Sequence, residues 1–86
     1  MSKPLHSLQV KILKLIYKRK MSIYKISKIL GKPTPLIQFH VNHLYKMGLL
    51  RREENKKNKG YVYKTNHSKV KIEDVKDKTI VYIKVE

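Results

Sequence analysis

The stretch TPLIQFHVNHLYKMGLL, residues 34–50, decides the fold of this chain. Residues 31–33, Gly-Lys-Pro, interrupt the helical pattern that precedes it. Thr34 has a side-chain oxygen that suits an N-cap, and Pro35 fits the first turn of a helix. We therefore predict a helix over residues 35–47, followed by a glycine and a strand.

The predicted helix has one apolar and one polar side. At about 100° per residue, Ile37, Val41 and Leu44 share a side, and the opposite side carries no acid. Gln and Asn side chains can form two hydrogen bonds to an adenine edge, and an aromatic ring can lie on a thymine methyl group. We predict base contacts in the major groove of DNA from Gln38, Phe39, Asn42 and His43. The alternative for the aromatic ring is that a neighbouring element covers it.

The segments around this helix complete a compact pattern. Ser22 can cap a shorter helix that ends at Gly31, with the small Ser27 where two helices would cross. Strands are predicted over 49–54 and 61–65, joined by the turn 55–60, here named the wing. Contacts to the DNA backbone are predicted from Ser22, Lys25, Lys28, Thr34, Lys46, Arg51 and Arg52, and from the wing lysines Lys56, Lys57 and Lys59. The alternative for the wing lysines is that they are solvated turn residues.

The order of these pieces resembles a winged helix-turn-helix of the ArsR and MarR groups of prokaryotic regulators. The residues that carry the resemblance are Ser22 to Gly31, the helix after Pro35, the Gly48-Leu49-Leu50-Arg51-Arg52 run and Gly60-Tyr61-Val62-Tyr63. The resemblance implies an α+β, mainly helical fold with three helices and a β-hairpin wing, and a transcriptional regulator that binds DNA. The composition, rich in lysine and isoleucine and free of cysteine, also resembles small regulators of hyperthermophilic archaea and their viruses.

A first helix is predicted over residues 5–18, with Leu5, Leu8, Ile12, Leu15 and Ile16 on its main apolar face. A second apolar stripe, at positions i, i+3 and i+7, consists of Val10, Leu13 and Tyr17. One interpretation is a contact between the two chains of a homodimer, which would let the pair read two half-sites. The other is that the C-terminal strands of the same chain cover the stripe.

Beyond a DNA-binding domain of residues 1–66, we predict an additional β-hairpin within 67–86, packed on the domain or on a dimer partner. Its strands are predicted over 70–72 and 79–85, with residues 73–78 as a polar turn. The hairpin has three alternative positions: it extends the wing sheet, packs on the first helix, or pairs with a second chain. Many ArsR relatives have a C-terminal helix instead, so this segment departs from the family pattern.

The net positive charge of the chain indicates what kind of molecule it binds. The chain has 21 basic and 6 acidic residues, for a formal net charge of +15, and residues 1–52 contain no acid. Such a field attracts polyanions, so double-stranded DNA is the predicted partner, with an anionic membrane surface as the alternative. A third reading is that lysines only keep a thermophilic protein soluble.

Several classes are excluded or disfavoured by composition. Without cysteine there are no disulfides and no thiolate metal site, and no cofactor or metal is predicted. His40 and His43 have an i, i+3 spacing, but His40 is interpreted as a packing residue beside Val41. No catalytic constellation or phosphate-binding glycine loop is recognisable, so no enzyme is expected. No stretch is long enough to span a membrane, which predicts a cytoplasmic protein, in the host cytoplasm if it is viral.

The sequence thus favours a sequence-specific regulator that binds duplex DNA. A protein that coats DNA without sequence preference is the first alternative, although Gln38 and Asn42 favour base reading. The second is a winged-helix module that contacts a protein through Phe39 and the Val10, Leu13 and Tyr17 stripe. RNA binding through Tyr61 and Tyr63 is a weaker alternative. A partner in the transcription machinery cannot be named from these residues.

Overall fold

The computed structural model describes residues 5–57 and 59–84. Three helices come first: α1 (Ser7–Leu15), α2 (Ile23–Leu30) and α3 (Thr34–Lys46). The strands are β1 (Met21–Ser22), β2 (Leu50–Glu54), β3 (Tyr61–Thr65), β4 (Val70–Val75) and β5 (Lys78–Ile83). This is the predicted α+β winged helix-turn-helix with an additional C-terminal hairpin, and the prediction of fold class is confirmed.

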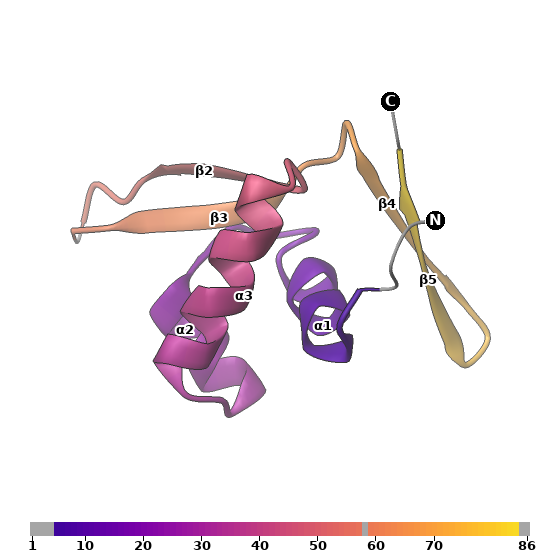
Figure 1. Cartoon of the computed structure of the whole chain (residues 1–86), viewed down its shortest axis with the longest axis horizontal. Helices are drawn as coiled ribbons and strands as arrows, with labels where there is room; N and C mark the ends of the chain where they lie inside the picture. Colours follow the sequence, from indigo (N-terminus) through magenta and orange to yellow (C-terminus); the bar gives the residue numbers. More distant parts are fainter. Residues whose placement is uncertain (1–4, 58, 85–86) are drawn as a thin grey trace.

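The strands form two separate antiparallel sheets. One, the wing sheet, has the order β1-β3-β2, and its β2–β3 hairpin, which carries the wing, projects beyond the helices (Figure 1). The other contains only β4 and β5 and lies beside α1, so that α1 sits between α3 and this hairpin (Figure 1). Strand β1 was not predicted, because two residues are too few to show an alternating pattern.

Local capping explains where α2 begins and ends. The Ser22 hydroxyl oxygen accepts a hydrogen bond from the Lys25 amide at 3.2 Å, as predicted. Gly31 ends the helix in the left-handed region, with φ of 63°, a conformation that costs little without a Cβ. The Ser27 hydroxyl then donates to the Lys32 carbonyl and accepts from the Thr34 hydroxyl, so it fixes the turn into α3.

The start of α3 differs from the prediction by one residue. Pro33 occupies the N-cap position, Thr34 is the first helical residue, and Pro35 is the second. The prediction that Thr34 caps the helix is therefore wrong, because its hydroxyl is directed to Ser27 rather than to a free amide of its own helix. The helix ends near Gly48, where φ is 80° and the amide of Leu49 donates to the carbonyl of Leu44.

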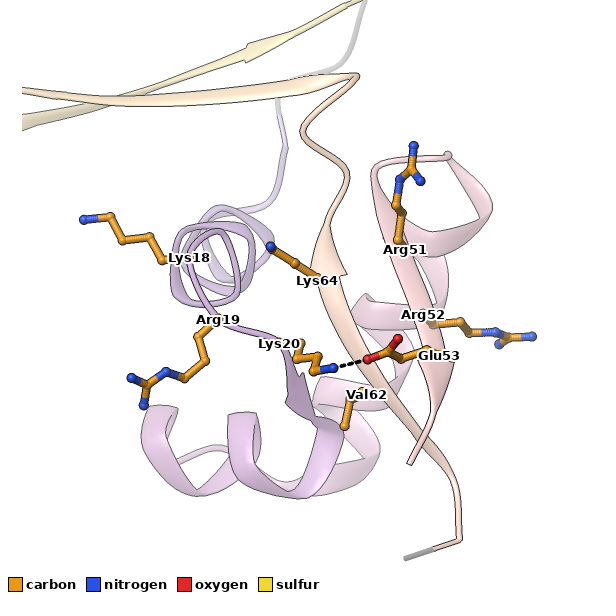
Figure 2. Close-up of a pocket in the computed structure, with 8 residues that line it drawn as sticks. All are labelled: Lys18, Arg19, Lys20, Arg51, Arg52, Glu53, Val62 and Lys64. Carbon is orange, nitrogen blue, oxygen red and sulfur yellow. Dashed lines mark hydrogen bonds and ion pairs between the residues drawn. The ribbon is translucent and has the colours of Figure 1, made fainter. Parts of the chain in front are cut away.

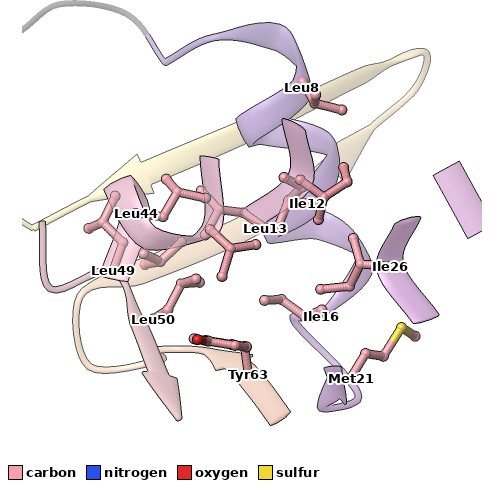
Figure 3. Packing of buried hydrophobic residues seen from close by; sticks show 13 residues of the cluster. Leu8, Ile12, Leu13, Ile16, Met21, Ile26, Leu44, Leu49, Leu50 and Tyr63 are labelled. Carbon is pink, nitrogen blue, oxygen red and sulfur yellow. The ribbon is translucent and has the colours of Figure 1, made fainter. Parts of the chain in front are cut away.

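One core joins the three helices, the wing sheet and the start of the C-terminal hairpin (Figure 3). Side chains with no exposed surface come from α1 and its C-cap, from α2 and from α3: Ile12, Leu13, Ile16, Ile26, Ile37, Val41 and Leu44. Leu50, Tyr63 and Val70 close the core from the strands. Burial of this apolar surface at about 25 cal/mol per Å² is the main force that holds α3 in place.

Helix α1 is shorter than predicted, Ser7–Leu15 rather than 5–18, and His6 caps it. The C-terminal hairpin also differs, because β4 continues through Glu73 and Asp74 to Val75. The turn shrinks to residues 76–77, with Lys76 at φ of 55°. The sequence predicts a turn at these two acids, but pairing with β5 holds them in a strand. Val85, predicted as the strand end, lies outside the described residues.

The hairpin packs on α1 of its own chain. Ile72 and Val81 contact the core, and the Lys14 ammonium lies 3.1 Å from both the Asp74 carboxylate and the Thr79 hydroxyl. Strands β4 and β5 pair with each other and not with β1, β2 or β3, so the hairpin does not extend the wing sheet. The division of the chain into a DNA-binding domain, residues 1–66, and an extension, residues 67–86, stays a prediction. No helix among the described residues has the length and apolar character needed to cross a membrane.

Candidate nucleic-acid interface

The outer side of α3 is open to solvent along its length. Ile37, Val41 and Leu44 are fully buried, whereas the four side chains predicted to contact bases, Gln38, Phe39, Asn42 and His43, are all exposed. Thr34 and Lys46 are exposed at the two ends of the helix. The structure therefore brings these six predicted residues together on one helix, with no acidic side chain in α3.

Phe39 is the most exposed aromatic side chain of this helix, with 65% of its surface accessible. It touches His40 edge to face, with ring centroids 5.2 Å apart, but no neighbouring element within residues 5–57 and 59–84 covers it. Leu36, one turn earlier, is also exposed. Sequence reasoning did not include Leu36, although its position beside the outer side of the helix was readable from the helical period. The apolar part of the surface is thus larger than predicted.

A buried pair of polar side chains fixes α3 against α1. The side chains of Gln9 and His40 are each 7% exposed, and the Gln9 amide nitrogen lies 3.2 Å from His40 Nδ1. The Gln9 amide oxygen accepts from the backbone N–H of His6, also at 3.2 Å. Because that oxygen is the acceptor, the amide nitrogen is the donor to His40, whose Nδ1 must be unprotonated.

Protonation of His40 is disfavoured by this arrangement. Burial lowers the pKa of His40 below its usual value of 6.5, and the nearby His6 and His43 lower it further. A proton on Nδ1 would also oppose the Gln9 donor. His40 was predicted to be a packing residue rather than a metal ligand, and its side chain is buried between α1 and α3, with its ring 4.9 Å from that of His6.

Helix α2 supplies basic side chains next to α3. Lys25 and Lys28 are exposed, and the Lys28 ammonium lies 5.1 Å from the centre of the Tyr24 ring. Tyr24 is 62% exposed and was missed, although an aromatic residue four positions before a lysine is a recognisable helical pair. The Ser22 oxygen is occupied by its capping bond, which leaves only its hydroxyl hydrogen for a phosphate.

Arg51 and Arg52 lie on opposite faces of the wing sheet. Arg52 pairs in register with Tyr63, so the two side chains share a face of the sheet, and Tyr63 is buried. The Arg52 guanidinium lies 4.2 Å from the ring centres of both Tyr45 and Tyr61. It is therefore on the α3 side. Arg51 is on the other face, bonded to Asn66 and Ser68, so the structure does not bring it to the reading helix. Its predicted contact to the DNA backbone stays a prediction.

The wing lysines Lys56, Lys57 and Lys59 are exposed at the end of the β2–β3 hairpin. The turn is closed by the Asn55 amide, which donates to the Gly60 carbonyl at 3.0 Å, and by the Asn55 side chain, which accepts from the Lys57 amide. Asn58, within the predicted wing, lies outside the described residues. The lysines therefore project from a hairpin that leads away from the C-terminal end of α3 (Figure 1).

The apolar stripe predicted to form a dimer contact, Val10, Leu13 and Tyr17, is only partly exposed to solvent. Leu13 has no exposed surface, and its carbonyl accepts a hydrogen bond from the Thr65 hydroxyl at 2.9 Å. We therefore withdraw Leu13 as a dimer contact, because its own chain covers it. Tyr17 stacks on His67 with ring centroids 4.2 Å apart, and both Tyr17 and Val10 remain partly exposed. Leu13 belongs to the core of its own chain, and cover of the whole stripe by the C-terminal strands stays a prediction.

The fold and the exposed helix define a winged helix-turn-helix protein, a class in which one helix is presented to DNA. The sequence profile described as "Bacterial regulatory protein, arsR family" matches residues 6–52, more than half of the 86 residues. The chain belongs to the ArsR family and is a DNA-binding transcriptional regulator of that type. Neither the comparison with curated proteins nor the comparison with solved structures finds a match.

Proposed function

We propose that this regulator binds duplex DNA sequence-specifically, with α3 in the major groove and the wing on the DNA backbone or in the minor groove. The observation that carries the proposal is the outer side of α3, where two amides and an aromatic ring are exposed on a helix whose opposite side is buried in the core. Backbone coating needs only lysine and arginine, whereas Gln38 and Asn42 are suited to base edges.

Phosphate contacts would surround this reading surface. Lys25 and Lys28 are exposed on α2, Lys46 at the end of α3, and Arg52 at the base of the wing. The guanidinium of Arg52 is held between two tyrosine rings, so less side-chain entropy would be lost when it binds a phosphate. If about 6 to 10 phosphates are neutralised, affinity would fall by about 10³ to 10⁵ between 50 and 200 mM salt.

We also propose a homodimer that uses the C-terminal hairpin. Val75 and Tyr82 are exposed on one face of the β4–β5 hairpin and Ile83 is exposed on the other, while Val10 of α1 and Tyr17 after it are partly exposed. A two-fold pair would place two reading helices on half-sites about one DNA turn apart. Sedimentation of the wild type and of Tyr82→Lys tests this: the variant should be monomeric at concentrations where the wild type is dimeric.

The test of sequence reading is selection from random duplexes, followed by affinity measurements on the selected and on scrambled DNA. Asn42→Ala should lose about 1 to 3 kcal/mol of discrimination, because one bidentate contact contributes about that much. Lys46→Ala is the control, because removing a phosphate contact should weaken binding to both DNAs equally. Equal affinity of the wild type for every duplex would instead indicate an architectural protein.

A further inference from the structure

A second basic surface lies on the face of the wing sheet that points away from α3. A hollow of about 640 Å³ is bordered by basic side chains from the segment after α1 and from β2 and β3. We name this the outer basic surface, and it consists of Lys18, Arg19, Lys20, Arg51, Glu53, Val62 and Lys64. Figure 2 shows Lys18 and Arg19 on one side of the hollow and Arg51 on the other, with Lys64 and the Lys20–Glu53 pair between them.

Strand register places this surface opposite the reading helix. Arg51 pairs with Lys64, and Glu53 pairs with Val62, so these four side chains share one face of the sheet. The intervening pair, Arg52 and Tyr63, is on the other face, where Tyr63 is 3% exposed and contacts Tyr45 of α3. Arg52 also lines the hollow, but its guanidinium lies 4.2 Å from the centre of the Tyr45 ring, so it is left out of the outer basic surface.

The cations of the outer basic surface are largely uncompensated. Among the residues that the structure describes, Lys20 is the one member with an acidic partner, Glu53, and their hydrogen bond lowers the pKa of that carboxyl. Arg51 is oriented by two neutral acceptors: its Nε lies 3.2 Å from the Asn66 oxygen and its Nη2 lies 3.4 Å from the Ser68 hydroxyl. Five cations beside one acid produce a net positive field that attracts a polyanion.

The composition of the hollow indicates which polyanion fits. Among the described residues that line the hollow, Val62 is the one apolar side chain, and it is partly buried, so these residues offer no large hydrophobic anchor of the kind that most protein interfaces contain. The other lining side chains are charged, and their exposed heads offer charge and hydrogen-bond donors. A phosphate backbone needs nothing more, because Arg and Lys neutralise phosphates without reading sequence.

We propose that the outer basic surface binds the phosphate backbone of a second DNA duplex, so that one chain bridges two duplexes. The reading helix would hold one duplex and the opposite face of the wing sheet the other. This activity goes beyond the binding of a single operator, and it does not require that α3 reads sequence.

The experiment is a two-duplex capture assay with the full chain. One duplex is biotinylated and immobilised, the other carries a dye, and captured dye measures bridging. The variant Lys18→Gln, Arg19→Gln, Lys64→Gln removes three exposed cations that have no ion pair among the described residues. The matched control, Lys11→Gln, Lys76→Gln, Lys84→Gln, removes three exposed charges elsewhere.

Capture should fall at least tenfold in the outer-surface variant and less than threefold in the control, while the two variants keep similar affinity for a single immobilised duplex. Wild-type levels of capture by the outer-surface variant would overturn the proposal, since a dimer with two reading helices would then account for bridging. No capture by the wild type would overturn it as well. Gln38→Ala, Asn42→Ala should lose sequence preference but retain capture, which separates failure of this proposal from failure of the proposed function.

Discussion

Replacing Gln9 by methionine tests how α3 is held in place. Methionine preserves the length and most of the volume of the side chain but removes the acceptor for the His6 amide and the donor to His40, each 3.2 Å away. Each lost hydrogen bond costs about 1 kcal/mol, and a buried, unpaired His40 Nδ1 adds up to about 1 kcal/mol more. Gln9→Met should therefore reduce the free energy of unfolding by about 2 to 3 kcal/mol.

Urea denaturation followed by circular dichroism measures this loss, with an unchanged slope if only stability is affected. In a chain of this size, 2 to 3 kcal/mol corresponds to a fall in Tm of roughly 10 to 20 °C. The control is Lys11→Met, an exposed change on the same helix, which should stay within about 0.5 kcal/mol of the wild type. A loss below 0.5 kcal/mol for Gln9→Met would refute the reasoning.

Three further predictions concern pH, the core and one helix end. Burial, His6 and His43 lower the pKa of His40 in the folded chain, so the unfolded chain binds more protons below about pH 6.5. The free energy of unfolding should therefore fall as the pH drops from 7.5 to 5.5. Urea titrations of His40→Gln should show a smaller fall over the same pH range. Leu13→Ala should cost about 2 to 5 kcal/mol in chemical denaturation, because the fully buried side chain leaves a cavity, whereas a loss under 1 kcal/mol would restore Leu13 as a surface residue. Gly31→Ala should cost about 1 kcal/mol by the same measurement, because φ there is 63°; a gain in stability would contradict the helix end described for α2.

Signals confined to a few neighbouring residues were read correctly from the sequence. Ser22 before an apolar run and Gly31 after it set the limits of α2, and both have local causes, a side-chain acceptor and a permitted positive φ. The apolar period in α3 correctly separated the buried Ile37, Val41 and Leu44 from the exposed side. Helical period also placed Gln38 and Asn42 in solvent.

Features that depend on distant residues could not be read. Leu13 is covered through contacts that include Thr65, 52 positions away in the chain, and no local pattern records that contact. Thr34 failed as a cap because Ser27, seven positions earlier, takes its hydroxyl. Glu73 and Asp74 lie in a strand because β5 pairs with them, against their local turn preference.

The opposite orientation of Arg51 and Arg52 could have been predicted from the sequence. Adjacent residues in a strand point to opposite faces, so Arg51 and Arg52 could not both face the reading helix. The same alternation, applied to Arg51 and Lys64 once their register is known, gives the outer basic surface. The cation–aromatic contacts of Arg52 needed the fold, since Tyr45 comes from α3 and Tyr61 from β3.

The central claim is that α3 reads base sequence, and selection of binding sites from a pool of random duplexes tests it most directly. We predict an enriched motif that the wild type prefers over scrambled DNA, with a preference that weakens in Gln38→Ala and Asn42→Ala. A two-fold symmetric motif would in addition support the proposed homodimer. Absence of any enriched motif, with equal and salt-sensitive binding to every duplex, would contradict sequence reading by α3.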